Sequence, residues 1–198
     1  MKLSIVGINE ISTKFIARSG IQKNLSVEER TTYSSLDSYK QNDWLAGRMA
    51  IKQAVLTYKN SNEQLTSIKI CYRETGQPYI LAAPGLRCSL SHSYGYGIAA
   101  VASRPVGIDI EKIRSHKSEL LKYIAQRHEM RLFQTRQKKA ANIITMIWTI
   151  KEAVMKGLGT GLNLKPSEMV IKKINTDNSS IVRVTSLQWA STWRVCTY

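Results

Sequence analysis

Two carboxylate residues, Asp109 and Glu111, stand two positions apart in the segment 106–111, which reads Val-Gly-Ile-Asp-Ile-Glu. In an extended strand, side chains two positions apart lie on the same face, so both carboxylates would point the same way. A hard divalent cation with oxygen ligands relieves the repulsion of such a pair, and Mg²⁺ is often held by one or two carboxylates. By itself, the segment is more typical of the solvated face of an edge strand.

A third acid lies near a lysine in the segment 148–156, which reads Trp-Thr-Ile-Lys-Glu-Ala-Val-Met-Lys. Glu152 and Lys156 are four positions apart and would be neighbours on one face of a helix. Taken alone, this pair is more typical of an ordinary surface ion pair, which contributes little to stability.

A third segment, 89–93, reads Ser-Leu-Ser-His-Ser and is followed closely by Gly95 and Gly97. Small hydroxyl groups, an imidazole and nearby glycines suit the close approach of a phosphate. The glycine spacing of a P-loop or a dinucleotide-binding turn is absent, and no G-x-S-x-G element marks a serine nucleophile. Taken alone, the segment predicts a loop.

Along the chain the three segments follow one another as 89–93 (the Ser-His motif), 106–111 (the acidic motif) and 148–156 (the Lys-Glu motif). In combination and in this order, they resemble the signature motifs of the 4′-phosphopantetheinyl transferase superfamily. The resemblance extends over roughly residues 43–170. The spacing of the two later motifs and the chain length are similar to the larger, surfactin-type class of that family. The resemblance implies Mg²⁺-dependent transfer of phosphopantetheine from coenzyme A to a serine of an apo acyl or peptidyl carrier protein, with release of 3′,5′-ADP.

The resemblance also implies roles for the charged residues of the two later motifs. Asp109, Glu111 and Glu152 would hold Mg²⁺ against the pyrophosphate of coenzyme A. Glu152, directly or through a metal-bound water, would remove the proton of the carrier serine. Lys156 would bind the pyrophosphate oxygens, with Lys151 as a possible helper.

The nucleotide end of coenzyme A would be bound by residues in the first half of the chain. By resemblance, Ser91 and His92 contact its phosphates, with His92 at the 3′-phosphate. Arg48 matches a family position that binds the same phosphate, a task that suits a bidentate guanidinium, and Arg73 is a further candidate. One departure concerns Gln77, which stands where many relatives carry a lysine and brings no positive charge. Glu129 lies where relatives often carry an acid, and we expect no metal role for it.

The composition is strongly basic: 29 Lys and Arg against 14 Asp and Glu give a formal net charge of +15. The electrostatic field of such a net positive charge attracts polyanions and acidic proteins by long-range steering. The resemblance implies an acidic carrier protein as the partner, steered by a basic surface. Candidates for that surface are Lys117, Lys122, Arg127 and Arg131, which equally fit a solvated helix face.

Two other function classes compete with this interpretation. A small nucleic-acid-binding module would fit the charge and the four tryptophans. Clustered acids at Asp109, Glu111 and Glu152 would repel nucleic-acid phosphates, so we expect no nucleic-acid partner. A scaffold that kept the fold but lost the chemistry is disfavoured because all three acids and Lys156 are present.

The cysteines and the N-terminus bear on location. Three cysteines without C-x-x-C spacing predict thiols in a reducing compartment rather than a disulfide framework or zinc site. The first apolar run is short for a signal peptide, and no stretch approaches membrane-spanning length. We therefore expect a cytoplasmic protein with no membrane partner. By resemblance we also expect a monomer.

The surrounding elements that must position these motifs predict an α+β fold. Apolar residues near helical period predict helices over 43–58 and 138–157, and a helix starts near Ser26. A basic helix is expected over 117–135. Strands are expected at 2–8, 67–73, 79–81, 97–102 and 106–111. Three further strands, at 168–174, 180–187 and 192–197, are expected to form a meander. Two halves, 1–104 and 105–198, each combine a small antiparallel sheet with helices. By resemblance, the halves are similar and related by a pseudo-twofold axis, with the nucleotide end bound by the first and the metal by the second.

Overall fold

The computed structural model of the chain describes residues 4–5, 23–114, 123–134, 140–174, 179–185 and 190–196. The chain divides into two compact units, 1–110 and 111–198. Each unit combines helices with small antiparallel sheets, so the predicted α+β class is confirmed. The division follows Ile110, later in the chain than the expected boundary after Arg104.

The described residues of the first unit form two helices and two small sheets. Strand β1 (Ser4–Ile5) pairs with β5 (Tyr96–Ala102), which pairs with β4 (Arg87–Ser93), and β2 (Ile70–Tyr72) pairs with β3 (Pro78–Ile80). The helices are α2 (Val27–Ser35) and α3 (Ser38–Lys59), and a short 3-10 helix, η2, spans Leu65–Ser67. The expected helix 43–58 and strand 97–102 are confirmed, while the strand expected at 67–73 is shorter because η2 precedes it.

Helix α2 begins at the predicted start. The Ser26 hydroxyl accepts a hydrogen bond from the Glu29 backbone N–H at 3.3 Å, and the Glu29 carboxylate accepts one from the Ser26 N–H at 2.9 Å. This reciprocal capping box satisfies two backbone donors that a helix start leaves open. It also fixes Glu29 in the first turn, where its carboxylate points to the interior of the unit.

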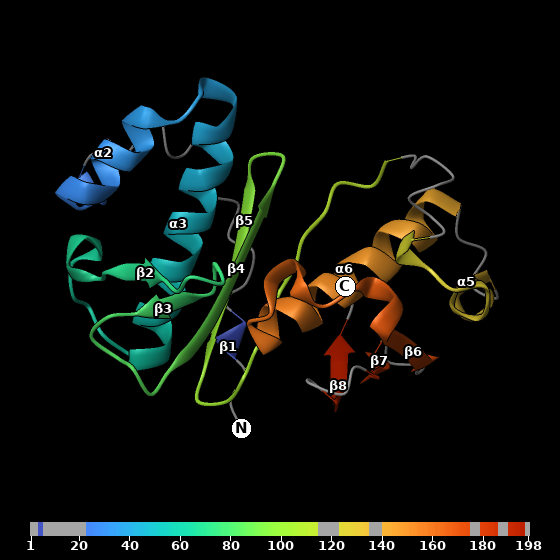
Figure 1. The fold of residues 1–198 in the computed structure, drawn as a ribbon. Coiled ribbons are helices and arrows are strands. Elements are labelled where there is room, and N and C mark those ends of the chain that lie inside the picture. Colours follow the sequence, from blue (N-terminus) through green and yellow to red (C-terminus); the bar gives the residue numbers. More distant parts are fainter. Residues whose placement is uncertain are drawn as a thin grey trace. The chain divides into compact units, whose positions relative to one another are not determined.

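Helix α3 lies along the β4–β5 hairpin (Figure 1) with its backbone close to that of β5. A Cβ atom at Gly97 would be 2.2 Å from the Ala46 carbonyl carbon and oxygen, which no real structure tolerates. A Cβ at Gly47 would be 2.9 Å from Cδ2 of His92. Glycine at these two positions therefore allows α3 to pack against the strands that carry the Ser-Leu-Ser-His segment.

The segment 89–93 is part of strand β4, so its interpretation as a loop is wrong. Residues Arg87–Ser93 pair in continuous antiparallel register with Tyr96–Ala102. The two-residue turn between the strands consists of Tyr94 at φ 55° and Gly95 at φ 81°. Two left-handed residues match the twist of a tight hairpin, although this Tyr-Gly pair is not the usual Asn-Gly signal.

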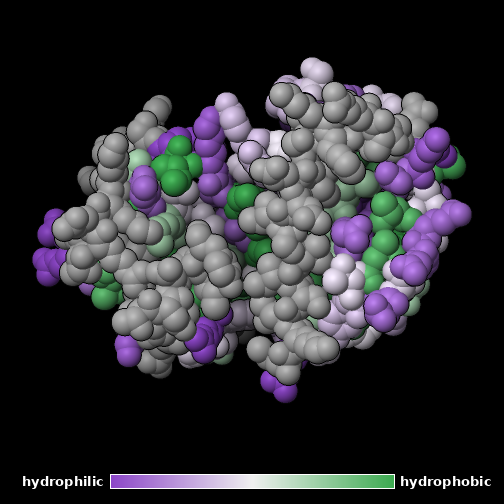
Figure 2. Space-filling view, turned by 180° about the vertical axis from the view of Figure 1, so that it is seen from behind, coloured by the Kyte–Doolittle hydropathy of each residue, from purple (hydrophilic) through white to green (hydrophobic). Residues whose placement is uncertain are grey.

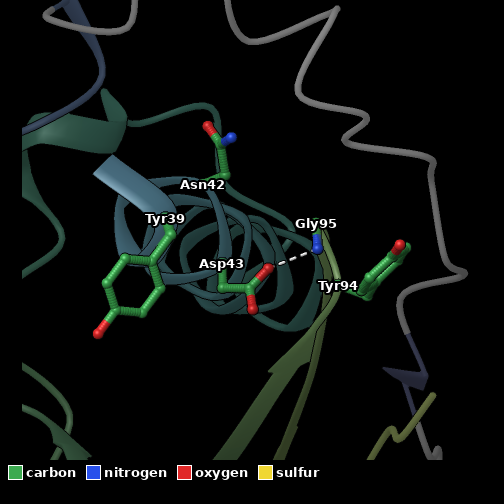
Figure 3. A pocket seen from close by; sticks show the side chains of 5 residues that line it. All are labelled: Tyr39, Asn42, Asp43, Tyr94 and Gly95. Atoms are coloured by element: carbon green, nitrogen blue, oxygen red, sulfur yellow. Dashed lines mark hydrogen bonds between the residues drawn. The ribbon is translucent and has the colours of Figure 1, made fainter. Parts of the chain in front are cut away.

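The turn is also tied to helix α3. The Asp43 carboxylate accepts a hydrogen bond from the Gly95 backbone N–H, and both residues line a pocket with Tyr39, Asn42 and Tyr94 (Figure 3). The hairpin is thus held to α3 near its turn by this bond and further along by the close approach at Gly97.

The second unit packs helices α5 (Arg127–Gln134) and α6 (Ala140–Leu158) with a three-stranded sheet. Strands β6 (Met169–Ile174), β7 (Ser179–Val184) and β8 (Ser191–Cys196) form an antiparallel meander, as the sequence predicts (Figure 1). Two 3-10 helices, η3 (Gly161–Asn163) and η4 (Pro166–Glu168), join α6 to β6. Of the basic helix expected over 117–135, residues 117–122 and 135 lie outside the described residues, and α5 starts only at Arg127 because residues 125–126 are not helical.

The core of this unit forms between α6 and the sheet. Ile147 and Ile150 of α6 are fully buried and cluster with Met169, Ile171 and Val182 of the meander. Isoleucines three and four positions apart produce this apolar stripe. The remaining faces of α6 can therefore carry the polar residues of the Lys-Glu motif.

The acidic segment 106–111 is not a strand, contrary to the prediction from its alternating pattern. Residues 105–114 form neither helix nor strand. The Ile108 N–H donates to the Ser89 hydroxyl at 3.1 Å rather than to a neighbouring strand, and Pro105 has no N–H to donate. The hydroxyl of Ser89 thus accepts the backbone hydrogen bond that a neighbouring strand would otherwise accept.

No helix within the described ranges is long and apolar enough to cross a membrane. On the face shown in the space-filling view (Figure 2), the described residues include both hydrophilic side chains and small hydrophobic areas.

Candidate active site

Strand β4 presents its small hydroxyl side chains to the acidic segment. Ser89 and Ser91, on one face of the strand, are 2% and 6% exposed, whereas His92 on the other face is exposed. The Ser89 hydroxyl accepts from the Ile108 N–H, and the Ser91 hydroxyl donates to Oδ1 of Asp109 at 2.8 Å. Within the first unit, the Ser-His and acidic motifs are therefore in direct contact.

In the second unit, the carboxylates of Glu111 and Glu152 approach each other. One oxygen of each lies within 4.8 Å of the other, and both side chains are partly buried. Two unit charges at this distance repel by about 3.5 kcal/mol at an effective dielectric constant of 20. Lys156 Nζ lies 3.3 Å from Oε1 of Glu152, and Arg114 Nη2 lies 3.9 Å from Oε2 of Glu111, so a cation flanks each acid.

These carboxylates fit a magnesium site by their donor chemistry. Mg²⁺ binds through hard oxygen ligands and keeps several waters when few carboxylates hold it. Asp109 lies two positions before Glu111 in the chain. Two residues span at most about 7 Å, so the Cα atom of Asp109 lies within that distance of the Cα atom of Glu111. All three carboxylates, of Asp109, Glu111 and Glu152, offer oxygen ligands rather than the nitrogen and sulfur ligands of a structural zinc site.

Lys151, the residue before Glu152, is not part of this group of charges. Its ammonium is fully buried and lies 2.8 Å from Oε2 of Glu129, and it donates to the carbonyls of Ile124 and Pro166 at 2.8 and 3.1 Å. Burial lowers the pKa of Lys151, while the Glu129 carboxylate opposes that shift. The expectation that Lys151 helps at the pyrophosphate is therefore wrong.

Glu129 is equally committed to the interior. Its Oε1 accepts the Ile171 N–H at 2.9 Å and its Oε2 accepts the Gln126 N–H at 2.8 Å, in addition to the Lys151 ammonium. A carboxylate with these partners ties the start of α5 to strand β6. Its role is structural, in agreement with the expectation that it holds no metal.

Arg48 lies inside the first unit rather than at its surface. The side chain is 6% exposed, and its guanidinium carbon lies 4.8 and 5.5 Å from the ring centroids of Trp44 and Tyr72. It donates to the Ile70 carbonyl at 3.3 Å and to the Tyr72 hydroxyl at 3.4 Å, and its Nε lies 3.7 Å from Glu29. Its contact with coenzyme A stays a prediction.

The other predicted nucleotide contacts are accessible. Arg73 is exposed, and its guanidinium carbon lies 5.3 Å from the Tyr79 ring centroid. The tight turn that follows is closed by a bond from the Arg73 N–H to the Gln77 carbonyl at 2.9 Å. His92 is exposed beside Gly47. On α5, Arg127 and Arg131 are both exposed, while Lys117 and Lys122 lie outside the described residues.

Ser89 is a residue of this region that the motif interpretation missed. Its hydroxyl holds the backbone of the acidic segment, and only its spacing of two from Ser91 could have indicated a shared face. That signal depends on a strand conformation, and the segment alone predicts a loop.

Comparisons with known proteins agree with the motif interpretation. Residues 105–197 match the 4′-phosphopantetheinyl transferase superfamily. A 4′-phosphopantetheinyl transferase of Bacillus subtilis is 30% identical over 68% of this chain and 58% of its own length. The enzyme gsp of Aneurinibacillus migulanus is 25% identical over 79% of this chain and 65% of its own. Sfp of Bacillus subtilis strain 168 is 31% identical over 50% of this chain and 45% of its own.

The alignments thus span less than two thirds of the length of these relatives. The family match at residues 105–197 includes both the Lys-Glu motif (148–156) and the acidic motif (106–111), whose carboxylates at Glu111 and Glu152 approach within 4.8 Å in the second unit. Over residues 105–197 the chain is similar to the 4′-phosphopantetheinyl transferase superfamily.

Proposed function

We propose that this protein transfers 4′-phosphopantetheine from coenzyme A to a serine of an apo acyl or peptidyl carrier protein, with Mg²⁺ as cofactor. The observation that carries the proposal is the close approach of Glu111 and Glu152, with Lys156 Nζ 3.3 Å from Glu152, in the part of the chain that matches the family.

The carboxylates Asp109, Glu111 and Glu152 would hold the ion. When bound, Mg²⁺ neutralises charge on the pyrophosphate of coenzyme A. Glu152 accepts the proton of the carrier serine, directly or through a water. The serine oxygen then forms a bond to the phosphorus that bears pantetheine, and the bond from that phosphorus to 3′,5′-ADP breaks. Lys156 binds the pyrophosphate oxygens as negative charge collects on the leaving group.

The exposed residues of the first unit suit the nucleotide end of coenzyme A. His92 and Arg73 are accessible to a phosphate, and the proposal assigns them to the 3′-phosphate region. Arg48 and Ser91 belong to the same proposed contact set, although each already has partners inside the unit. Any ligand contact they make would come in addition to those partners.

A basic surface for an acidic carrier is the second part of the proposal. Arg127 and Arg131 lie one helical turn apart on α5 and are both exposed, and the net charge of +15 steers acidic partners toward the protein. A nucleic-acid-binding module is the disfavoured alternative, because Glu111 and Glu152 lie close together and would repel phosphates.

The two units also share an internal device, which supports the proposal that the halves are similar. In the first, Lys52 is fully buried and bonds to Glu29 Oε2 at 2.5 Å and to the carbonyls of Asn24 and Leu65. The Lys151 ammonium of the second unit likewise bonds to one glutamate and two carbonyls. In each case the glutamate also accepts the backbone N–H three residues before it.

Mass spectrometry of apo carrier proteins incubated with the protein, coenzyme A and Mg²⁺ tests the proposed function. We expect the carrier to gain one phosphopantetheine group, with no gain when the metal is chelated. Glu152→Gln should reduce the rate by two orders of magnitude or more, as loss of an acid-base group does. Glu63→Gln, which removes a surface acid paired with Lys59, should behave as wild type. A folded protein that modifies none of several carriers and does not bind coenzyme A would overturn the proposal.

A further inference from the structure

The hydrogen bond between Ser91 and Asp109 suggests a role for this serine beyond the one that the family motif implies. The Ser91 hydroxyl lies 2.8 Å from Oδ1 of Asp109, and Ser91 is 6% exposed. A hydroxyl directed at a carboxylate makes a charge-assisted bond, which is roughly twice as strong as a neutral one. The bond restricts the rotation of the Asp109 side chain.

We propose that Ser91 is a positioning residue that orients Asp109 as a metal ligand, and that this is its main contribution to the reaction. The inference rests on the proposed function, because it takes Asp109 as one of the three magnesium-binding carboxylates. It differs from a phosphate contact, because the serine acts through another protein side chain rather than on coenzyme A.

The setting of Asp109 explains why a positioning residue is needed. Residues 105–114 have no helix or strand to hold them, so the acidic segment has no ladder of backbone hydrogen bonds. Strand β4 supplies two anchors instead: Ser89 accepts from the Ile108 N–H at 3.1 Å, and Ser91 holds the next side chain. Their spacing of two places both hydroxyls on one face of the strand.

The anchor itself is rigid. Ser91 pairs with Ile98 in the register of β4 with β5, and β5 packs against α3 so closely that Gly97 has no space for a side chain. A ligand-orienting group on a packed strand holds its partner more accurately than one on a loop. Hydrogen-bond partners of metal ligands typically contribute 10–100-fold to metal affinity.

The test compares Ser91→Ala with Ser91→Thr, which keeps a hydroxyl donor. Mn²⁺ alone serves as the probe, and its binding is measured by the electron paramagnetic resonance of the free ion. We expect Ser91→Ala to weaken Mn²⁺ binding by about tenfold and Ser91→Thr to stay within about threefold of wild type. In an Asp109→Asn background, Ser91→Ala should cause no further loss. Ser67→Ala, an exposed serine of the same unit, is the matched control.

The kinetic arm separates positioning from phosphate binding. With an apo carrier, Ser91→Ala should raise the Mg²⁺ concentration for half-maximal rate by about tenfold, while the KM for coenzyme A at saturating Mg²⁺ stays within about twofold. A raised coenzyme A KM with unchanged Mn²⁺ affinity would overturn the inference in favour of a phosphate contact. Absence of Mn²⁺ binding by the wild type would overturn it as well. Mn²⁺ binding that depends on Ser91 without any carrier modification would refute the proposed function but support the positioning role.

Discussion

The ammonium of Lys151 lies 2.8 Å from the carboxylate of Glu129, and neither side chain is exposed to solvent. The next residue along α6, Glu152, is partly exposed and has Lys156 Nζ 3.3 Å from its carboxylate. The two lysines of one motif therefore serve different purposes: Lys151 ties α6 to α5, and Lys156 stays accessible beside the acids.

Methionine substitutions at the two lysines should separate stability from activity. Lys151→Met leaves the Glu129 carboxylate buried without its ammonium partner, which should cost about 3–5 kcal/mol in the free energy of unfolding. Lys156→Met removes a partly exposed ion pair and should change that free energy by about 1 kcal/mol or less, while lowering the transfer rate at least tenfold. Urea denaturation and carrier modification measure the two effects.

A double substitution provides the control for this interpretation. Glu129→Leu combined with Lys151→Met removes both charges, and the pair should be less destabilised than the sum of the two single variants. Additive losses would contradict the assignment of a buried, directly coupled pair. A Lys156→Met protein with normal transfer would contradict the role of that lysine.

Local pattern was sufficient to predict the helices over 43–58 and 138–157 and the meander, because each has a periodic apolar face that the core uses. It failed where a distant partner decides the conformation. The segment 89–93 becomes a strand only through its pairing with 96–102, and the alternating segment 106–111 bonds to a serine side chain instead of a strand.

The candidate site shows the same limit. The spacing of Glu152 and Lys156 predicts their contact, because four positions along a helix determine it. Burial of Arg48 and Lys151 depends on Glu29 and Glu129, which lie about twenty residues earlier and reach them only in the folded units. From sequence alone, a charged side chain in an amphipathic helix is predicted to face solvent, because its buried ion-pair partner is not known.

Alanine substitutions at Gly97 and Gly47 should differ in their effect on stability. Gly97→Ala places a Cβ 2.2 Å from the Ala46 carbonyl, so the backbones of β5 and α3 must separate, and overpacking of this kind costs about 1–3 kcal/mol or more. At Gly47 the nearest atom, 2.9 Å away, belongs to the His92 ring, which can rotate. The gain in helix propensity, about 1 kcal/mol, offsets that strain.

Gly47→Ala should therefore keep its melting temperature but bind coenzyme A less tightly, because His92 is displaced. Gly97→Ala should melt at a clearly lower temperature. Thermal unfolding together with titration of coenzyme A distinguishes the two. Equal melting temperatures for both variants would show that α3 and β5 separate without cost and would argue against this packing.

Two arginines of the proposed nucleotide site should differ in what they stabilise. Arg48 is enclosed by Trp44, Tyr72 and the Ile70 carbonyl, so Arg48→Ala should lower the free energy of unfolding by about 3 kcal/mol. Arg73 is exposed, and Arg73→Ala should change stability by less than about 0.5 kcal/mol. If Arg73 binds a phosphate, its loss should weaken coenzyme A binding by about tenfold, equivalent to roughly 1.4 kcal/mol.

Arg48→Lys sharpens this comparison, because lysine keeps the charge but not the planar, stacked guanidinium. The lysine variant should lose most of the stability that alanine loses. Chemical denaturation and calorimetric titration of coenzyme A measure both properties. Full stability of Arg48→Lys would mean that charge alone, rather than stacking between the two rings, holds this residue in place.

The thiol of Cys88 should make the first unit sensitive to alkaline pH. It is 3% exposed and lies 3.4 Å from the Pro78 carbonyl, and burial raises its pKa from 9.0 to about 12. Between these values the unfolded chain releases the thiol proton and the folded protein keeps it. The stability contributed by the neutral thiol is therefore fully present below about pH 9 and decreases as the pH rises above it.

Cys88→Ala removes this titration and nothing else that ionises, so it isolates the effect. Between pH 9 and pH 10 the wild type should lose about 1 kcal/mol more unfolding free energy than the variant, since one pKa unit corresponds to about 1.4 kcal/mol. Urea denaturation at the two pH values measures the difference. In the folded protein at pH 8, iodoacetamide should modify the half-buried Cys71 well before Cys88. Equal labelling of the two thiols would show that strands β4 and β5 separate readily and that Cys88 is not held in an apolar core.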